Sequence, residues 1–212
     1  MHKQVISLVR SDPYCNTVDM FVINADQRSS RTEADRVPQL LTAAADCAAA
    51  LPFERTVGDE VQGVFASGAD VLAALEIILR SGRWSVGIGI GAAQLADRPS
   101  ASRGSAFIAA RDAVEIAKNR WQEIAVCSPN GTVEPAQTLA CLTGHWIERA
   151  SERQWSVLRL ARNHTQRQVA AQLQISQQAV SDSLRASKAA AIDEGMTQLE
   201  VLLDREDGRC DV

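Results

Sequence analysis

The stretch from Arg55 to Phe65, RTVGDEVQGVF, places a β-prone run on each side of Gly58-Asp59-Glu60. This pattern predicts a β-hairpin that carries adjacent carboxylates at its tip. An earlier apolar run, from Val18 to Asn24, is followed by another acidic residue, Asp26. If the two runs are neighbours in one sheet, Asp26 and Asp59 converge.

The order of apolar runs and Ala/Leu-rich stretches predicts the sheet around this hairpin. The first six predicted elements spell βαββαβ, the split βαβ or ferredoxin-like pattern of an α+β fold. Right-handed crossovers then place the first strand between the third and the fourth, antiparallel to both. The predicted strands cover 18–25, 53–57, 61–66, 84–90 and 123–127, and the predicted helices cover 33–51, 69–81 and 104–119.

This topology brings Asp26 close to Asp59 and Glu60. Facing carboxylates are hard oxygen ligands suited to Mg²⁺ or Mn²⁺, which keep water and take substrate phosphates as further ligands. The alternative is a simple hairpin turn, since Gly-Asp is ordinary turn chemistry. On the hairpin alone, the turn is the simpler interpretation.

Further motifs follow in a fixed order along the chain. They are INADQRSSR at 23–31, TVGDEVQG at 56–63, GIGIG at 87–91, GSAF at 104–107 and AAR at 109–111. This set resembles the SatD family of bacterial proteins, which carry D-x-x-x-S-R, GDE-x-Q-G and a terminal helix-turn-helix. More distantly, it is similar to the palm of class III nucleotidyl cyclases and of GGDEF proteins. The resemblance covers nearly the whole chain and implies a palm that binds a nucleotide or cyclic nucleotide with Mg²⁺ or Mn²⁺ at Asp26, Asp59 and Glu60.

The loop after Asp26 is the first candidate for phosphate binding. Backbone amides and the hydroxyls of Ser29 and Ser30, at the start of the predicted helix, would hold phosphate while Arg28 or Arg31 supplies charge. The alternative is that a serine caps the helix and the arginines are solvated. The resemblance adds Arg55 and Gly58 of the hairpin to the expected nucleotide site.

The second candidate lies on the helix predicted over 104–119. Arg111 stands in an A-A-R context similar to that of cyclases, and Lys118 follows two turns later on the same face. Such cations would offset charge that develops on a triphosphate. For Lys118, a surface pair with Asp112 or Glu115 is an equal alternative.

Departures from the cyclase pattern favour nucleotide binding over turnover. Arg55 stands where adenylate cyclases have the base-reading lysine, and Val57 replaces the second glycine that GGDEF enzymes need. The acidic partner and the asparagine expected before A-A-R are also missing. No catalytic residue is therefore assigned beyond the candidate Arg111. A metal-dependent nucleotidyl cyclase or nucleotidyltransferase, and a degenerate palm that serves as a dimerisation scaffold, remain alternatives.

Glycines at 87, 89 and 91 remove every second side chain from one predicted strand. One face of that strand therefore leaves room for a close neighbour. The neighbour is either a ligand or a packed helix, and a helix is the commoner case.

Composition places the chain among cytoplasmic proteins of one or two domains. It has 212 residues, of which 46% are apolar, enough for a packed core. The longest apolar run is broken by Glu76 and is far too short to span a membrane, and no export signal precedes Arg10. The five cysteines lack C-x-x-C spacing and are expected to be reduced thiols.

The net charge of −4 is unevenly distributed. Residues 151–191 carry six Lys and Arg against two Asp and Glu, a net of +4, whereas residues 192–212 carry a net of −5. A basic segment of this kind is a candidate nucleic-acid surface. Without a motif, a solvated helical face would be the better interpretation.

That basic segment contains the clearest motif of the chain. Residues 152–162 are amphipathic, Thr165 and Gln168 match a capping box before a second helix, and Ser176 caps a third that begins at Gln177. The spacing predicts a helix-turn-helix and resembles region four of bacterial sigma factors. Its expected buried contacts are Val169, Ala170, Leu173, Ile175, Val180 and Leu184.

In this motif the first turns of the last helix enter the major groove. Asp182 lies on the predicted DNA face and would repel phosphate. A three-helix module for protein contacts is the alternative to DNA binding. The predicted contacts are Gln177, Gln178 and Ser181 to base edges, Ser176 at the helix start, and Arg167, Arg185 and Lys188 to phosphates.

We therefore expect a cyclase-like palm over 1–130, a linker and bridging helix over 131–150, and an all-α helix-turn-helix domain with a C-terminal helix over 151–212. Ile192, Met196, Leu199 and Leu202 or Leu203 recur at near-heptad spacing and should pack in the domain or on a second subunit. The expected function is that of a DNA-binding transcriptional regulator, active as a homodimer on double-stranded DNA, whose palm senses a nucleotide.

Overall fold

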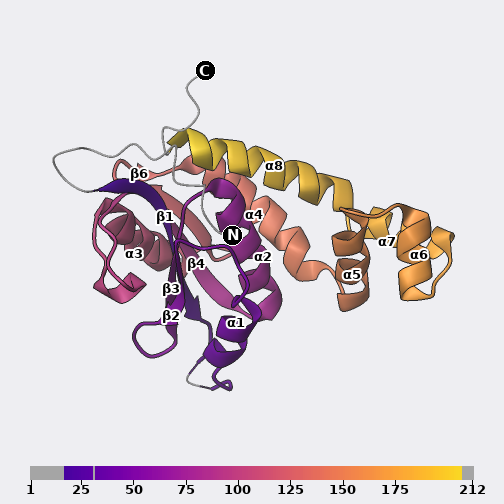
Figure 1. Cartoon of the computed structure of the whole chain (residues 1–212), viewed down its shortest axis with the longest axis horizontal. Coiled ribbons are helices and arrows are strands. Elements are labelled where there is room, and N and C mark those ends of the chain that lie inside the picture. Colours follow the sequence, from indigo (N-terminus) through magenta and orange to yellow (C-terminus); the bar gives the residue numbers. More distant parts are fainter. Residues whose placement is uncertain (1–16, 31, 207–212) are drawn as a thin grey trace, which may run out of the picture.

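The computed structural model describes residues 17–30 and 32–206, and these form an α+β structure with one six-stranded sheet and eight α-helices (Figure 1). The strands lie in the order β2-β3-β1-β4-β5-β6. Their bounds are Val18–Gln27 (β1), Leu51–Arg55 (β2), Glu60–Phe65 (β3), Trp84–Ala93 (β4), Ile124–Ser128 (β5) and Gly131–Thr132 (β6). The helices are Val37–Ala43 (α1), Gly68–Ser81 (α2), Ser105–Ala117 (α3), Glu134–Arg149 (α4), Glu152–Ala161 (α5), Gln166–Leu173 (α6), Gln177–Ala186 (α7) and Ala189–Glu206 (α8).

Strand β1 occupies the centre of the sheet. It pairs antiparallel with β3 on one side and with β4 on the other, which confirms its predicted position. In this register Asp26 lies opposite Glu60 on β3 and opposite Ser85 on β4. Strand β5 runs parallel to β4, and the short strand β6, which was not predicted, completes the sheet.

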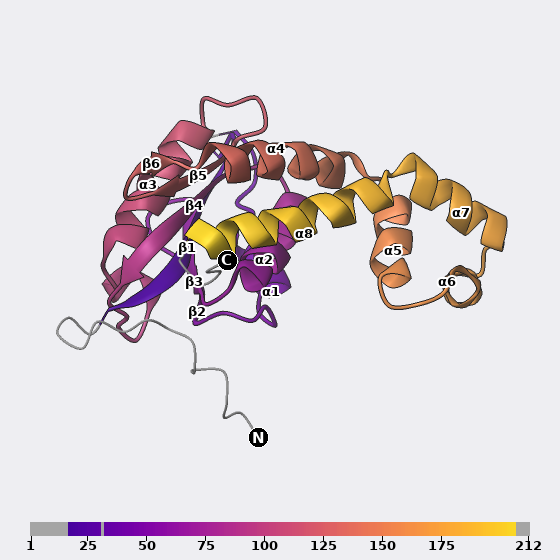
Figure 2. The ribbon, with the colours of Figure 1, turned by 90° about the horizontal axis from the view of Figure 1, so that it is seen from above.

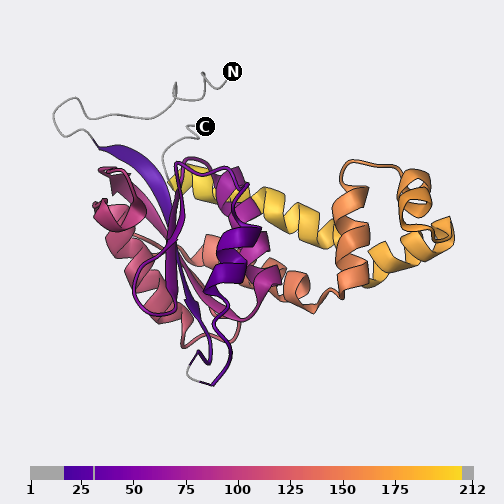
Figure 3. The same cartoon turned by 60° about the horizontal axis from the view of Figure 1, so that its bottom comes forward.

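The two faces of the sheet are covered by different helices (Figures 1 and 3). Alternation along β1 directs Phe21 and Ile23 into a large core shared with α1, α2, α4 and α8. The intervening residues Met20 and Val22 belong to a smaller cluster with Ala106 and Ala110 of α3. Helix α3 is thus the cover of the face on which Asp26, Glu60 and Ser85 also lie.

Helix α3 takes up the space left by the glycines of β4. A Cβ atom at Gly87 would come within 2.2 Å of the backbone nitrogen of Val114, and one at Gly89 within 2.2 Å of that of Ala110. The close neighbour expected over this strand is therefore a packed helix, and the alternative of a ligand at Gly87 and Gly89 is wrong.

The prediction of one long helix over 33–51 is wrong. Helix α1 has seven residues, with Pro38 in its first turn, and the chain from Ala44 to Ala50 is not helical. Proline disfavours helical conformation in the residue before it, so a helix starts there more readily than it passes through. The Gln27 side chain also holds the preceding loop, because its amide donates to Ala34 O (2.8 Å) and accepts from Arg36 N (2.8 Å).

Helices α5, α6 and α7 form a head that projects away from the sheet (Figures 1 and 2). Their small core contains Val157, Val169, Ala170 and Val180. The predicted capping box of Thr165 and Gln168 is confirmed, as is the cap of Ser176 on α7. Between α6 and α7 the chain turns at Gln174, which has the left-handed φ of 53°. Local sequence signals therefore determine where these helices begin and end.

Helix α8 returns from the head along α4 and α2 (Figure 2). Ile192, Met196, Leu199 and Leu203 are buried in the same core as α2, α4 and the sheet. The apolar stripe thus packs within the chain. At the end of α8, Asp204 accepts a hydrogen bond from Gly68 N at the start of α2 (2.9 Å).

Two expectations from the composition concern membrane-spanning helices and the oxidation state of the cysteines. None of the helices in the described ranges combines the length and the hydrophobicity that a bilayer-crossing segment needs. Cys47, Cys127 and Cys141 are free thiols, and burial raises the pKa of each.

The contact between α3 and β4 gives a direct test of the packing. Gly89→Ala should lower the free energy of unfolding by about 3 kcal/mol, because the new methyl group meets helix backbone that cannot rotate away. The measurement is urea denaturation followed by circular dichroism. Gly63→Ala is the matched control, since its Cβ meets the half-buried Phe53 ring. Equal stability losses in both variants would contradict the argument.

Candidate functional site

The predicted carboxylates meet at one end of the sheet. Asp26 and Glu60 face each other across the β1–β3 ladder, and Gln27 N donates to the carbonyl of Asp59 at 3.3 Å. Thr56 Oγ1 donates to Glu60 Oε1 at 3.2 Å, which ties this side chain to the hairpin. The sheet register therefore brings Asp26 to the hairpin that carries Asp59 and Glu60.

A lysine from α3 reaches the Asp26 carboxylate. Lys118, the residue after the last of α3, places its ammonium 2.7 Å from Asp26 Oδ2 and 2.7 Å from Glu115 Oε1. Burial opposes the charge, but hydrogen bonds to Asp26 and Glu115 outweigh it and raise the pKa of Lys118 above its usual value. Lys118 is therefore charged at neutral pH, and it pairs with Asp26 as well as with the expected Glu115.

A second ion pair at this end was not predicted. Glu123 precedes β5 with a left-handed φ of 52°, and its carboxylate lies 2.6 Å from Arg28 Nη2. Ser85, the β4 partner of Asp26, donates its hydroxyl to Glu123 Oε2 at 2.5 Å. The sequence signal that could have pointed to Glu123 is its position directly before an apolar run. Asp26 has the mirrored position, near the end of the apolar strand β1.

The expectation that the loop after Asp26 starts a helix, which both the phosphate and the capping interpretations used, is wrong. Ser29 and Ser30 lie in a turn well before Val37, where α1 begins, so neither residue caps that helix. Ser29 has φ of 58°, and its carbonyl accepts from the amides of Thr32 and Glu33. The loop is separate from the helix because Gln27 and Pro38 delay the helix start. Arg31 lies outside the described residues.

Arg55 is engaged with its own hairpin and with the loop before α1. Its guanidinium donates to the carbonyl of Gly58 (3.1 Å) and to Asp35 Oδ2 (2.5 Å). The hydrogen bond from Arg55, followed by that from Val37 N, holds the pKa of Asp35 below its usual value. Gly58 supplies the positive φ of 62° that the turn requires. In this state Arg55 organises the hairpin turn.

Arg111 differs from the other predicted phosphate ligands. It is exposed on α3 and makes no hydrogen bond or ion pair with a residue in the ranges described above. Arg28, Arg55 and Lys118 are each paired with carboxylates. Arg111 is therefore the predicted cation most available to a ligand.

Charged side chains of both signs lie at the carboxylate end of the sheet. Five acidic residues belong to it, and two cations, Arg28 and Lys118, pair with three of them. Arg55 of the hairpin is a further cation there and pairs with Asp35. In residues 17–30 and 32–206, no group of three or more His, Cys, Asp or Glu side chains is arranged as a metal site. The five acids are Asp26, Asp59, Glu60, Glu115 and Glu123.

The outer face of α7 exposes most of the predicted DNA contacts. Gln177 and Gln178 in its first turn are exposed, while Ser181 is half-buried. Asp182 Oδ1 accepts from Gln178 Nε2 at 3.0 Å and lies 3.5 Å from Arg185 Nη1. The acid on this face is thus paired on both sides along the helix. The other exposed candidates are Arg167, Ser176, Arg185 and Lys188.

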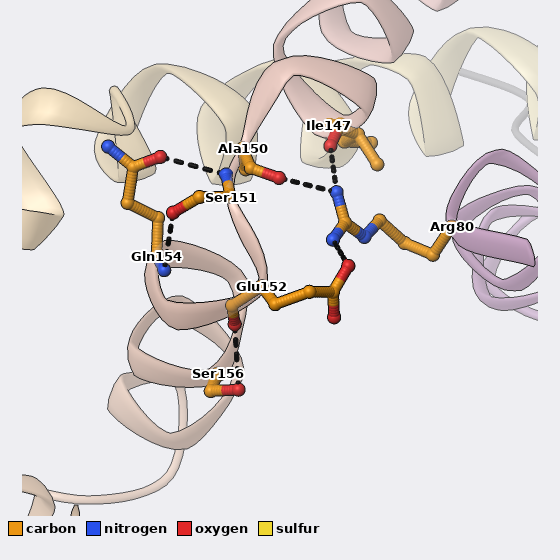
Figure 4. Close-up of polar contacts among 7 residues, drawn as sticks. All are labelled: Arg80, Ile147, Ala150, Ser151, Glu152, Gln154 and Ser156. Carbon is orange, nitrogen blue, oxygen red and sulfur yellow. Dashed lines mark hydrogen bonds and ion pairs between the residues drawn. The ribbon is translucent and has the colours of Figure 1, made fainter.

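Arg80 of α2 joins the head to the sheet (Figure 4). Its Nη1 donates to the carbonyls of Ile147 (3.0 Å) and Ala150 (2.6 Å) at the end of α4, and its Nη2 pairs with Glu152 of α5. The guanidinium also lies over the Trp155 ring, 5.4 Å from its centre. One side chain of α2 therefore holds both the end of α4 and the start of α5.

Arg162 makes the second connection between head and sheet. It forms two hydrogen bonds with Glu76 of α2 (2.6 and 2.9 Å) and a third with Asp193 of α8 (3.0 Å). Burial opposes the charge, but the contacts with Glu76 and Asp193 raise the pKa of Arg162 further above its usual value. The head is thus clamped to α2 and α8 by charged side chains, none of which the sequence singled out as functional.

Comparison of the chain with known proteins identifies no relative. No protein-family model matches the chain, and no curated protein or solved structure matches it significantly. The functional argument therefore starts from the contacts described above.

The Arg80 contacts predict the cost of loosening the head. Arg80→Ala should lower the free energy of unfolding by about 3 kcal/mol, because it strips donors from the carbonyls at the end of α4 and leaves Glu152 without its pair. The measurement is urea denaturation, with limited proteolysis between α4 and α5 as a local readout. Arg159→Ala, at an exposed arginine of α5, is the control. Similar behaviour of the two variants would contradict the clamp.

Proposed function

We propose that this protein is a DNA-binding transcriptional regulator whose sheet domain binds a nucleotide or cyclic nucleotide together with Mg²⁺ or Mn²⁺. The observation that carries the proposal is the exposed, polar first half of α7, capped by Ser176 and lying at the end of the molecule remote from the sheet (Figure 1). A helix presented in this way has the form needed to enter a major groove.

The head supports DNA binding through its shape and its charge. Helices α6 and α7, joined by the tight turn at Gln174 and packed on α5, support the proposed helix-turn-helix. Gln177 and Gln178 would meet base edges, and the exposed Arg167 and Lys188 would meet phosphates. The net charge of +4 over 151–191 favours a negatively charged partner such as DNA over a basic one.

The sheet domain supports nucleotide binding through metal. The strand order β2-β3-β1-β4 supports the expected ferredoxin-like palm, which would be similar to that of nucleotidyl cyclases. Asp26 and Glu60 are cross-strand neighbours and Asp59 precedes Glu60, so their carboxylates would supply hard oxygen donors of the kind that Mg²⁺ or Mn²⁺ prefers. A divalent cation bound to these carboxylates would favour the approach of phosphates, and the exposed Arg111 would contact them.

The clamp between α2 and the head supports a regulatory link. Helix α2 packs on the face of the sheet opposite to Asp26, and Arg80 and Glu76 on the same helix hold α4, α5 and Arg162. A ligand that shifts α2 would therefore change the position of the head. A homodimer would present two heads to two half-sites of one DNA duplex.

Two substitutions test the DNA-binding proposal, one at an expected base contact and one at an expected phosphate contact. Gln178→Ala should weaken binding to a selected site by about 1 to 3 kcal/mol and relax specificity at one base pair, because a base contact is lost. Arg167→Ala should weaken all sequences alike and reduce the slope of log affinity against log salt by about 1. Fluorescence anisotropy on selected and scrambled duplexes measures both. Equal effects of Gln178→Ala on the two duplexes would contradict base reading.

The metal proposal is tested through Lys118. Lys118→Met should raise Mn²⁺ affinity about tenfold, because the ammonium that competes for Asp26 is removed. Titration calorimetry measures the affinity with and without ATP, GTP or cyclic dinucleotides. Asp26→Asn should abolish binding, and Lys188→Met controls for the loss of a charge elsewhere. Unchanged Mn²⁺ affinity in Lys118→Met, or retained affinity in Asp26→Asn, would contradict a metal at this position.

A further inference from the structure

One exposed stripe of α7 contains an acid where a DNA-binding surface would be expected to carry bases. Gln178, Asp182 and Arg185 follow one another about one turn apart, and all three are exposed. A single oxygen of Asp182, Oδ1, receives both Gln178 Nε2 (3.0 Å) and Arg185 Nη1 (3.5 Å). Neither contact uses Oδ2, so this oxygen of the exposed side chain is available to accept a hydrogen bond from a ligand.

Asp182 determines the orientation of the Gln178 side-chain amide. An ionised carboxylate can only accept hydrogen bonds, so Gln178 must direct its amide nitrogen, not its oxygen, towards Asp182. The amide then has one remaining N–H donor and the free acceptor Oε1. This pair matches the edge of adenine in the major groove, which offers the N7 acceptor and the N6 amino donor.

The free oxygen of Asp182 adds its own preference. It can accept from the amino group of cytosine or of adenine. Guanine presents the acceptors O6 and N7, and thymine presents the acceptor O4 and a methyl group, so neither offers a donor and their acceptors repel a carboxylate. Phosphate is repelled in the same way, although the Arg185 contact reduces the negative charge of the stripe.

We infer that Asp182 is a specificity-determining residue, which positions Gln178 to read adenine and rejects guanine and thymine at the neighbouring base on the same strand. The inference rests on the proposed DNA-binding function and specifies what the head reads. Asp182 acts partly through Gln178, as a positioning residue, and partly through its own Oδ2.

The experiment is selection from a randomised duplex library with the full-length protein, followed by affinity measurements on single-base variants of the winning site. The wild type should enrich a site in which Gln178→Ala erases the preference for one adenine. The adjacent base on that strand should be adenine or cytosine. Asp182→Asn should lower discrimination at both positions about tenfold or more, while its affinity for random DNA stays equal or rises.

Two controls separate base reading from fold and charge. Glu194→Gln, an exposed acid of α8, removes the same charge from a position off the α7 stripe and should leave discrimination unchanged. If Asp182 acts through Gln178, the double variant should lose no more adenine preference than Gln178→Ala alone. Thermal unfolding should be the same for every variant, because all of these side chains are exposed.

The possible failures are distinguishable. A wild-type selection without any enriched site would overturn both the DNA-binding proposal and the inference. An enriched site that Asp182→Asn reads with unchanged discrimination would overturn the inference alone. Guanine or thymine beside the base read by Gln178 would also overturn it, as would equal losses of discrimination in Asp182→Asn and Glu194→Gln.

Discussion

The register of β1 between β3 and β4 is the constraint on which the rest of the sheet domain depends. Side chains alternate strictly along a strand, so a slip of one residue would turn Asp26 away from Glu60 and send Phe21 and Ile23 out of the main core. The buried hydrogen bond from Gln62 Nε2 to Asn24 Oδ1 (2.8 Å) lies on the Asp26 face of the sheet. It fits this register alone, because Asn24 and Gln62 are opposite each other in it. Carboxylate geometry and hydrophobic core are therefore two results of one pairing.

The close approach of α3 follows from that register. With Gly87 and Gly89 on the Asp26 face, the helix backbone lies directly on β4, and the end of the helix brings Lys118 to the carboxylates. The ammonium neutralises part of the negative charge while it occupies the side of Asp26 that a metal ion would approach. The proposed metal binding at this position would consequently be a competition between two cations, and its strength would depend on the position of α3.

The head is attached through both apolar and charged contacts, since Leu158 of α5 is buried in the main core and Trp155 and Leu184 pack against it. Arg80 and Arg162 reach from α2 and α5 towards carbonyl and carboxylate groups, with Trp155 stacked near both guanidinium groups. Contacts of this kind are directional, so they hold the head in one orientation as long as the partners stay in place. They also connect α2 of the sheet domain with the helices proposed to meet DNA.

The sequence by itself determined the features that depend on neighbours in the chain. The Thr165–Gln168 capping box, the Ser176 cap with the turn before α7, the apolar run of β1 and the glycine face of β4 were all predicted correctly, because each is a local pattern. The helix over 33–51 failed, since Pro38 and the distant hold of Gln27 on the loop outweighed its alanine-rich composition. Only the tertiary structure decided which charges meet. Arg28 with Glu123, Lys118 with Asp26 and Arg162 with Glu76 are each far apart in sequence, and ion pairing depends on distance in space, which no periodicity records.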